Sequence, residues 1–426
     1  MDHNSRRKFI SQLGVAFAGV SLPWASFSFE SSTQQNLLEL ASILDESDPV
    51  NEDFWNQVKM AYSASSTMLN FNNGGVSPQP KVVQEAFIHY YKSFNQAPSY
   101  YMWRIFQQEI ESVRLKMAKL GGVSKNEIAF NRNSTEALDT IIFGIDLKKG
   151  DEVVISNFDY PNMVQAWKQR EAREGIVLKE VKLTIPAEND QEIVNAYLNQ
   201  FSNKTKVVLI THLINWTGQI LPVAKIAAEA KKRGIKTISD SAHSFAHINY
   251  NIPDLGVDYF GTSLHKWLCA PFGTGMLWVS KEHITDLWPG LSPLDPKSDD
   301  IRKFETLGTR NMAAELATGK AVDFHNMIGS ERKEKRLRYL KDYWLKEALN
   351  IKGLKPFTSL KADYSCAIAT ISKEGVEALG SKLQKQFSIH TTNIKHQGVD
   401  GVRITPNVYT STKDLDRLIE ALNKIS

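Results

Sequence analysis

Asp240 and Lys266 are the two residues of this sequence whose types and positions most directly suggest shared chemistry. A β-prone segment, residues 237–239, ends at Asp240, and residues 257–262 predict a second strand that leads to Lys266. In an open parallel sheet, ligands bind at the carboxyl ends of the strands. The spacing between the two positions leaves room for one crossover connection. We therefore expect this carboxylate and this amine to lie at one edge of a sheet and to face one ligand.

Lys266 is a candidate nucleophile. It stands between His265 and Trp267 in a predicted tight turn, where a bare ammonium group is costly to bury. Either the pKa of the amine falls, or the amine is consumed in a covalent bond such as a Schiff base. The alternative is an ordinary surface lysine whose stem lies along the protein.

The same region contains a set of zinc-ligand residue types. Asp240 precedes His243 and His247, and the two histidines are spaced i, i+4 on a predicted helix. No glutamate stands in the general-base position of an H-E-x-x-H motif, and the segment S-L-H-K follows at residues 263–266. We therefore expect no metal here. A zinc hydrolase and a non-catalytic binding protein remain the alternatives from other classes.

The pattern D-x-A-H at residues 240–243, followed by S-x-H-K-W at residues 263–267, resembles the cofactor signature of a known enzyme family. This is the class V aminotransferase family of pyridoxal-phosphate enzymes, which includes isopenicillin N epimerase-like proteins and cysteine desulfurases. The resemblance implies fold type I, an α/β architecture with a large domain on a mainly parallel sheet and a smaller α+β C-terminal domain. It also implies pyridoxal 5′-phosphate as the cofactor and an amino acid as the substrate.

The resemblance assigns a role to each residue of the signature. Lys266 would form the Schiff base with the cofactor, and Asp240 would pair with the protonated pyridine nitrogen, which keeps the ring an electron sink. Ala242 would pack on the ring face, and His243 would lie near the phenolic oxygen of the ring. We take Lys266, Asp240 and His243 as the catalytic residues.

A phosphate site is expected at the start of a predicted helix. Ser134 and Thr135 lie where unpaired backbone N–H groups and the helix dipole attract an anion, although helix capping explains one hydroxyl equally well. The family holds its cofactor phosphate at this turn, and Ser263 and His265 would converge on it. Thr309 and the glycine before it match a pair that reaches the phosphate of the neighbouring subunit in relatives, which implies a homodimer with shared active sites.

Two further cofactor contacts are implied at the ends of predicted strands. Tyr160 follows the predicted strand 151–156 and would stack on the cofactor ring, a contact that stabilises by about 1 kcal/mol. Asn215 follows the predicted strand 206–211 and would contact an oxygen of the cofactor.

The substrate side is less specific. Arg403 matches the family's carboxylate-binding arginine, and its planar guanidinium suits an amino-acid substrate; an exposed strand arginine is the alternative. The resemblance places Asn73, in a glycine-containing loop, and the aromatic residues Tyr101 and Trp103 near the substrate. Such an aromatic cluster more commonly belongs to a core.

Length and composition bound these interpretations. The 426 residues exceed what one core usually holds, so two domains are expected, and predicted strands ending at residues 131, 156, 211, 239 and 262 alternate with helical stretches as in a parallel sheet. A net charge of +4 is small, and the charged run 331–338 mixes signs as a solvated helix face does, so we expect no nucleic-acid partner. Two cysteines, Cys269 and Cys366, are too few for a disulfide framework.

The N-terminal residues resemble an export signal. Residues 5–10 (S-R-R-K-F-I) and the apolar segment behind them are similar to a twin-arginine signal, so we expect export to the periplasm or cell envelope. The alternative is a basic stretch on an ordinary helix. Apart from this signal, which can act as an anchor, no segment is long and apolar enough to span a bilayer. The expected divisions are a signal peptide (1–30), an N-terminal helical arm (31–66), a large cofactor-binding domain (67–310), and a bridging helix with a small C-terminal domain (311–426).

The expected reaction follows from what the sequence lacks. Desulfurases carry a reactive cysteine on the loop before the carboxylate-binding arginine, but residues 387–401 contain none, and Cys269 does not match that position. This disfavours sulfur transfer through a persulfide. Transamination, epimerisation, and β- or γ-elimination remain. All three would begin when an amino acid displaces Lys266 from the cofactor and the released amine removes the α-proton.

Overall fold

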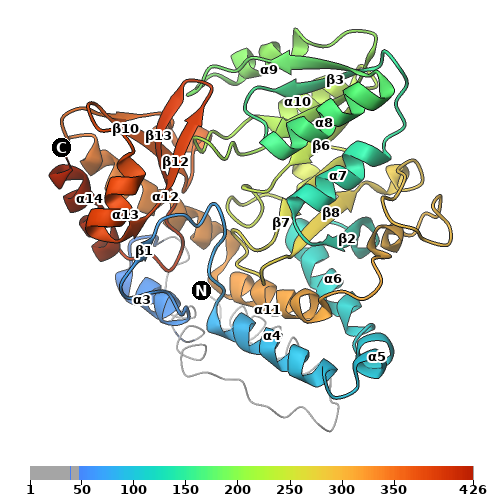
Figure 1. Cartoon of the computed structure of the whole chain (residues 1–426), viewed down its shortest axis with the longest axis horizontal. Coiled ribbons are helices and arrows are strands. Elements are labelled where there is room, and N and C mark those ends of the chain that lie inside the picture. Colours follow the sequence, from blue (N-terminus) through green and yellow to red (C-terminus); the bar gives the residue numbers. More distant parts are fainter. Residues whose placement is uncertain (1–38, 40–47, 426) are drawn as a thin grey trace, which may run out of the picture.

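A computed structural model describes residue 39 and residues 48–425 of the chain (Figure 1). Its centre is a seven-stranded sheet in the order β2-β8-β7-β6-β5-β3-β4. Pairing is parallel from β4 to β7, and β8 alone of these strands runs antiparallel to its neighbours β7 and β2. The strands are β2 (Ile128–Asn131), β3 (Glu152–Ser156), β4 (Val177–Val181), β5 (Thr205–Thr211), β6 (Lys236–Asp240), β7 (Tyr259–Ser263) and β8 (Gly275–Val279). The expected α/β fold with a mainly parallel sheet is confirmed, while β4 and β8 were not predicted.

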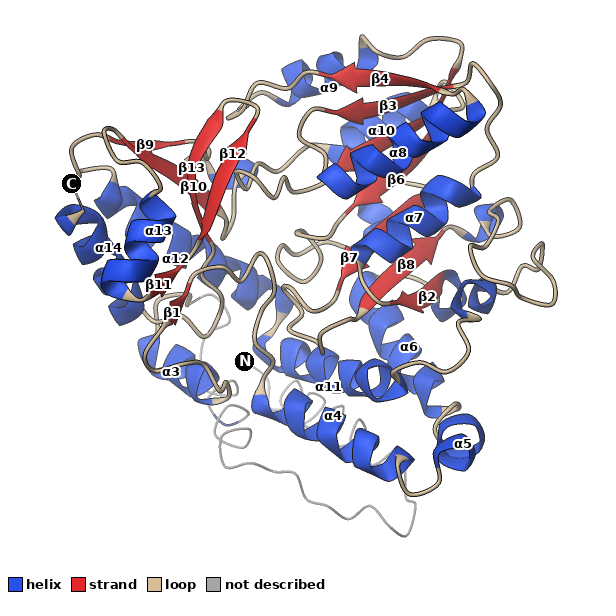
Figure 2. Cartoon of the chain, viewed as in Figure 1, coloured by secondary structure: helices blue, strands red, loops and turns tan. Residues whose placement is uncertain are grey.

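The central strands β5, β6 and β7 are buried along most of their length because helices cover both faces of the sheet (Figure 2). In β5, Val207 and Leu209 pack in one core cluster, and Val208 and Ile210 pack in the other. On one face lie α7 (Ser134–Gly144) and α8 (Pro161–Glu174), and the other core contains residues of α6 (Glu109–Gly121), α9 (Asp190–Leu198), α10 (Val223–Lys231) and α11 (Met312–Ile328). The strand ends are thereby held in fixed register at the edge that carries the candidate site.

The C-terminal part forms a smaller α+β body. Its antiparallel sheet has the order β12-β13-β10-β9, and a separate apolar cluster joins this sheet to its helices. The elements are α12 (Ser330–Ala348), β9 (Leu354–Pro356), β10 (Ala369–Lys373), α13 (Leu379–Phe387), β11 (Ile389–His390), β12 (Thr392–His396), β13 (Val399–Ile404) and α14 (Thr412–Lys424). A capping box formed by Ser411 and Asp414 begins α14.

The N-terminal segment connects the two bodies. After α3 (Glu52–Met60), the short strand β1 (Leu69–Asn70) pairs in parallel with β11, and the chain then enters α4 (Lys81–Phe94), α5 (Pro98–Tyr100) and a π-helix (Tyr101–Ile105). The predicted signal peptide, residues 1–30, lies outside the described residues, and so does the first part of the predicted N-terminal arm, residues 31–38 and 40–47. Within the part of the chain that the structure describes, no helix is long and apolar enough to cross a membrane.

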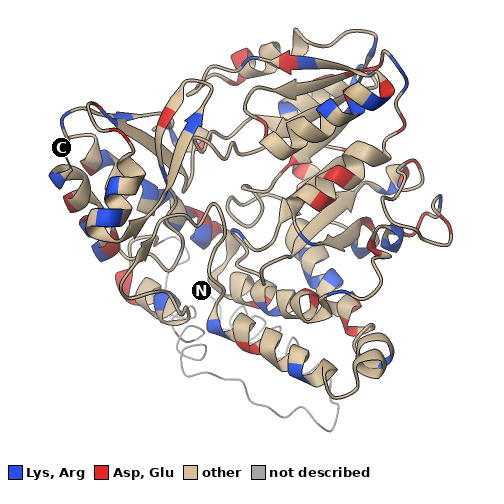
Figure 3. Ribbon diagram, in the orientation of Figure 1, with Lys and Arg blue, Asp and Glu red and all other residues tan. Residues whose placement is uncertain are grey.

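The charged run 331–338 is not the solvated helix face that its mixed signs predict. Arg332, Lys333 and Arg336 are each less than a tenth exposed. The Lys333 ammonium donates to the carbonyl of Trp267, and Arg336 donates to backbone carbonyls and to a carboxylate of the N-terminal arm. The prediction failed because the start of α12 packs against the lysine turn and the N-terminal arm, where its long cationic side chains reach buried carbonyl groups. Figure 3 shows how lysine and arginine residues are mixed with aspartate and glutamate over both bodies.

Candidate active site

Lys266 and Asp240 meet at the carboxyl edge of the main sheet. β6 ends at Asp240 and pairs in parallel with β7, which leads into the turn that carries Lys266. Lys266 Nζ lies 3.0 Å from Nε2 of His243. Asp240 Oδ1 accepts a hydrogen bond of 3.0 Å from the backbone N–H of Ala242, which folds the signature back over the carboxylate.

Burial and neighbouring charges set the protonation states of Lys266, Asp240 and His243. Burial lowers the pKa of Lys266 to about 8; the Asp240 carboxylate acts in the opposite direction, and the Arg403 cation lowers it further. Burial raises the pKa of Asp240, against the effects of the Ala242 N–H and of Lys266. Burial, followed by the nearby cations, holds the pKa of His243 well below its usual range, so this imidazole is neutral. Its Nε2 therefore accepts from Lys266, and its buried Nδ1 has no hydrogen-bond partner among the described residues.

The start of α7 and the end of β7, the strand that leads to Lys266, are joined through two serines. The Ser134 N–H donates to Ser263 Oγ at 2.9 Å, and the Ser263 hydroxyl donates to Ser134 Oγ at 2.9 Å. A Cβ on Gly275 would lie 2.6 Å from the backbone of Asn133, so only glycine lets β8 approach the helix start this closely. His265, from the lysine turn, donates from Nδ1 to the Thr274 carbonyl at 3.0 Å. Two hydroxyls and the N–H groups of a helix start are thus gathered at one point, as an anion requires.

Arg403 reaches the same region from β13. Its side chain is buried, with Nη1 donating to the Asn215 carbonyl at 3.0 Å and Nη2 donating to Asn72 Oδ1 at 2.9 Å. A Cβ on Gly74 would lie 3.5 Å from both Arg403 Cζ and His243 Cε1, which places the arginine and the histidine beside the same glycine. Arg403 Nε has no partner among the described residues. A buried guanidinium with a free N–H is a ready site for a carboxylate.

The sequence model of the family named Aminotransferase class-V matches residues 69–418. The chain belongs to the class V aminotransferase family. This confirms the resemblance found in the sequence, and with it an enzyme that depends on pyridoxal phosphate. The matched range includes the segment that carries Asp240, His243 and Lys266.

Individual relatives match between 62% and 87% of this chain. An isopenicillin N epimerase from Amycolatopsis lactamdurans is 25% identical over 393 residues, which cover 87% of this chain and 98% of the relative. A probable cysteine desulfurase from Synechocystis sp. is 29% identical over 282 residues, covering 62% and 66%. A solved structure of the C-DES protein, with glycine covalently linked to its PLP cofactor, superposes with a TM-score of 0.78 at 20% identity, over 86% of this chain and 99% of that one. The last similarity identifies the fold.

The residues at this edge fit the cofactor of the class V family. The unpartnered His243 Nδ1 and the single hydrogen bond of the Asp240 carboxylate leave polar atoms turned toward a ligand. The buried amine of Lys266 is available for the covalent link, and the Ser134 and Ser263 hydroxyls suit the phosphate. Ala242, buried beside Asp240, leaves room for a flat ring.

Tyr160 and Asn215 also lie at strand ends, as predicted. Tyr160 is the residue before α8 and is 39% exposed. It lies close enough to Arg403 to raise the pKa of that guanidinium, against the larger lowering effect of burial. Asn215 is buried, and its carbonyl holds Arg403. The half-buried Thr135 lies in the first turn of α7. Their contacts with the cofactor remain predictions.

Four residues expected from the resemblance are not brought to this edge by contacts in the described chain. The amide of Asn73 is fully used within the protein, because its Nδ2 donates to two carbonyls and its Oδ1 accepts from Tyr409 and Asn70. Tyr101 and Trp103 lie in the π-helix beside α4 and α5, with Trp103 half exposed. Thr309 is exposed in the loop before α11. The structure thus makes Asn73 a scaffold residue, and leaves the other three as predictions that involve a second subunit or a different conformation.

Sequence reasoning missed two residues of the site. Asn72, one position before the predicted Asn73, contacts Arg403. Asp159 is buried, accepts from Ser156 N–H and the Thr211 hydroxyl, and has its pKa raised to about 7, mainly by burial. Asp159 follows β3 as Asp240 ends β6, so the strand-end signal was present; nothing in the sequence distinguishes Asn72 from Asn73.

The zinc alternative fails on geometry. His247 donates from Nδ1 to the His243 carbonyl at 2.7 Å and accepts at Nε2 from the Ala367 N–H at 3.0 Å, so neither ring nitrogen is available to a metal. The segment is a series of turns rather than the predicted helix. Among the described residues, the group with metal-ligand spacing is Asp258, Glu282 and His283, at the opposite end of β7.

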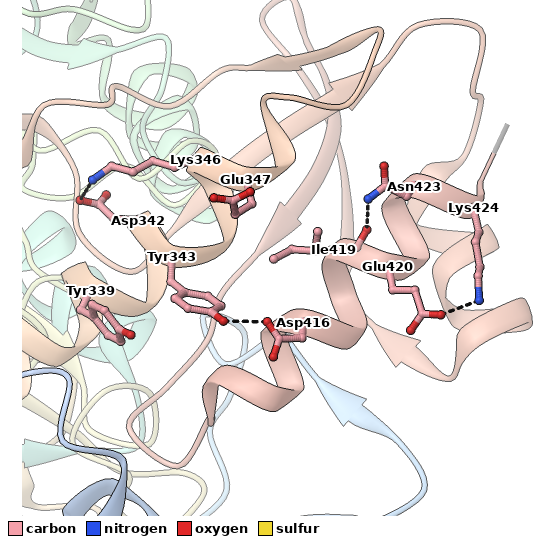
Figure 4. Close-up of a pocket in the computed structure, with 10 residues that line it drawn as sticks. All are labelled: Tyr339, Asp342, Tyr343, Lys346, Glu347, Asp416, Ile419, Glu420, Asn423 and Lys424. Atoms are coloured by element: carbon pink, nitrogen blue, oxygen red, sulfur yellow. Dashed lines mark hydrogen bonds and ion pairs between the residues drawn. The ribbon is translucent and has the colours of Figure 1, made fainter.

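A groove between α12 and α14 lies away from this chemistry. It encloses about 820 Å³ and is lined by Tyr339, Asp342, Tyr343, Lys346, Glu347, Asp416, Ile419, Glu420, Asn423 and Lys424 (Figure 4). Several of its polar groups pair with one another, including Lys346 with Asp342 and Tyr343 with Asp416. The residues that line this groove include none of the candidate catalytic residues. We therefore assign the active site to the sheet edge rather than to the groove.

Proposed function

We propose that this class V enzyme acts at the α-carbon of an amino acid as an aminotransferase or an epimerase. The observation that carries the proposal is the position of the Lys266 amine. It contacts neutral His243, and it lies close enough to Asp240 and Arg403 for both charges to shift its pKa. An amine, a carboxylate and a carboxylate-binding guanidinium are the three groups that such a reaction needs.

Each residue of the site has a separate role in the proposed reaction. Pyridoxal phosphate supplies an electron sink for the α-carbon when bound. Arg403 binds the substrate carboxylate through its free Nε–H and orients the α-carbon toward Lys266. With a pKa near 8, the Lys266 amine accepts a proton near neutral pH and returns it, and His243 holds the amine in place. As a carboxylate, Asp240 would hold a proton on the pyridine nitrogen of the bound cofactor.

The site where the proton returns distinguishes the two reactions. Return to the cofactor carbon gives transamination, and return to the opposite face of the α-carbon gives epimerisation. The match to isopenicillin N epimerase over 98% of that protein's length supports the epimerase reading. Elimination is the second candidate, supported by the likeness of fold to a cystine C–S lyase bound to its product cysteine persulfide.

A persulfide route has no support from the cysteines. Residues 387–401 contain none. Cys269 and Cys366 are both free and buried. A thiol that carries sulfur must reach the substrate and be able to ionise, but burial raises the pKa of Cys366 to about 12.

Two wider features belong to the same proposal. A homodimer is supported by the exposed Thr309 and the exposed aromatic side chain of Trp103, which a second copy would bring to a shared site. Light scattering of the purified protein tests this, and a monomer at all concentrations contradicts it.

Export through a twin-arginine route is supported by residues 5–10, and replacement of both arginines by lysine is expected to keep the protein in the cytoplasm.

A screen of half-reactions tests the chemistry. The purified enzyme is mixed with single amino acids while the visible spectrum and the optical rotation of the substrate are followed. Loss of the yellow form with release of a keto acid indicates transamination, and loss of rotation without keto acid indicates epimerisation. The Lys266→Ala variant is the control. No spectral change with any amino acid, or equal turnover by the control, contradicts the proposal.

A further inference from the structure

The hairpin formed by β12 and β13 joins the small body to the main sheet. Its strands pair from Thr392 opposite Arg403 to His396 opposite Val399. The two residues of the turn, Gln397 and Gly398, both have positive φ, as a tight two-residue hairpin requires. Arg403 therefore stands at the base of the hairpin and His396 at its tip, which reaches toward the strand ends of the main sheet (Figure 1).

His396 is seated between two loops of the main sheet. Its ring stacks on Trp216, with centroids 4.3 Å apart and an angle of 18°. Its Nε2 lies 2.8 Å from the Asn157 carbonyl oxygen, which only accepts, so this nitrogen is the donor. The ring also meets Phe158 edge-on at 5.7 Å. One imidazole thus joins the loop after β3 to the loop after β5.

The loop after β5 is held by the small body from a second direction. Three successive carbonyls, those of residues 215–217, each accept a hydrogen bond from a small-body side chain. The donors are Thr358, Thr370 and Arg403. Val399, beside the hairpin turn, is 3% exposed and packs in the same apolar cluster as one face of the main sheet. The hairpin, the loop and Arg403 therefore form one connected unit.

We propose that His396 is a positioning residue that seats this hairpin and thereby fixes Arg403 relative to Lys266. The proposal rests on the proposed function, in which Arg403 binds the substrate carboxylate. His396 contacts neither residue itself, so its effect passes through the β12–β13 hairpin. Loss of the ring stack and of the hydrogen bond frees the hairpin tip, and the guanidinium then samples positions too far from the amine.

The test combines two measurements on the cofactor-loaded enzyme. One is the apparent dissociation constant of a reactive amino acid, from the visible spectrum. The other is hydrogen exchange of residues 392–404 without the amino acid. His396→Ala is expected to weaken amino-acid binding by on the order of 10-fold and to speed exchange in the hairpin, while the yellow form at Lys266 is retained. His396→Gln, which keeps a donor, is expected to recover part of the affinity.

Matched variants separate the outcomes. Lys395→Ala, next to His396 with a side chain 89% exposed, is expected to behave as the wild type in both measurements. If His396→Ala fails to fold, His396→Phe keeps the stack without the donor and takes its place. Wild-type affinity in the His396 variants, or weaker binding with unchanged exchange in the hairpin, overturns the positioning role. Wild-type affinity in Arg403→Lys instead overturns the carboxylate site of the proposed function.

Discussion

Lys266 and His243 are joined by a contact of 3.0 Å between the lysine Nζ and the histidine Nε2. The contact connects the ends of two neighbouring parallel strands, since His243 follows β6 and Lys266 follows β7. It depends on a neutral imidazole, because only then does Nε2 accept from the amine. Burial keeps His243 neutral, so this pair holds the lysine in one orientation while leaving its pKa near neutrality.

The charge of Asp240 is expected to be essential. Asp240→Asn keeps the size of the side chain and an oxygen for the Ala242 N–H, but removes the negative charge. Turnover is expected to fall by about 100-fold or more, while the yellow form at Lys266 persists. Steady-state kinetics and the visible spectrum check this, with Asp400→Asn, at an exposed position, as the control. Turnover within about threefold of the wild type would show that the ring nitrogen is not paired with this residue.

Capture of the cofactor is expected to follow the ionisation of Lys266. Only the neutral amine attacks an aldehyde, and burial lowers the pKa of Lys266 to about 8. With the cofactor-free protein, the capture rate is therefore expected to rise up to about pH 8 and then level off. An exposed lysine, with a pKa of about 10.4, would give a rate still rising at pH 10.

The carboxylate of Asp240 favours the protonated form of Lys266. In Asp240→Asn, the pH at which the capture rate levels off is therefore expected to move lower. Stopped-flow absorbance between pH 7 and pH 10 measures both proteins. A levelling pH that is the same in the two, or that moves higher, would remove Asp240 from the surroundings of the amine.

Thiol chemistry is expected to be dispensable. Cys269 and Cys366 are both buried and free. The double variant Cys269→Ala, Cys366→Ala is expected to retain turnover within about threefold, with a loss of unfolding free energy of roughly 1 to 3 kcal/mol from the two small cavities. Iodoacetamide is expected to leave the native enzyme active. Abolished turnover in a folded double variant would restore the persulfide route.

Lys333 is expected to destabilise the folded protein near pH 7 while holding the Trp267 carbonyl. Burial lowers its pKa to about 8, so between pH 8 and its unfolded value of about 10.4 the unfolded chain binds more protons, and wild-type stability rises with pH. Lys333→Met lacks this term. Its stability relative to the wild type is expected to be higher at pH 7 than at pH 10, by roughly 1 to 3 kcal/mol.

Urea unfolding of both cofactor-free proteins at the two pH values measures this difference. Lys335→Met, on the same helix but partly exposed in a pair with Glu331, is the control and is expected to show no such change. A relative stability of Lys333→Met that does not change between pH 7 and pH 10 contradicts a buried, titrating lysine.

The strand ends could be predicted because each follows a short β-prone run and is marked by a polar residue. Asp240, Ser263 and Lys266 were placed correctly at one edge for this reason. β8 was missed because its run begins in a glycine-rich turn, and its role as the antiparallel neighbour of β2 and β7 depends on pairing that is distant in sequence. Asn72 was missed because it stands next to Asn73, a residue of the same type, and only the folded structure shows that Asn73 bonds to the Thr405 carbonyl while Asn72 contacts Arg403.

The error over the charged run 331–338 has a related cause. Helical spacing predicts which residues share a face, but not whether that face meets water or buried carbonyl groups. Lys333 lies under the lysine turn only because α12 crosses behind it, and no local pattern encodes that crossing. His396 is similar, since its partners Asn157 and Trp216 come from loops far away in sequence.

Reduction of the purified enzyme with borohydride, followed by mass spectrometry of its peptides, identifies the lysine that carries the cofactor. A pyridoxyl group is expected on a single lysine, Lys266, in the peptide that also contains Asp240 and His243. A modified lysine elsewhere, such as the buried Lys333, or no modification in an active enzyme, would contradict it.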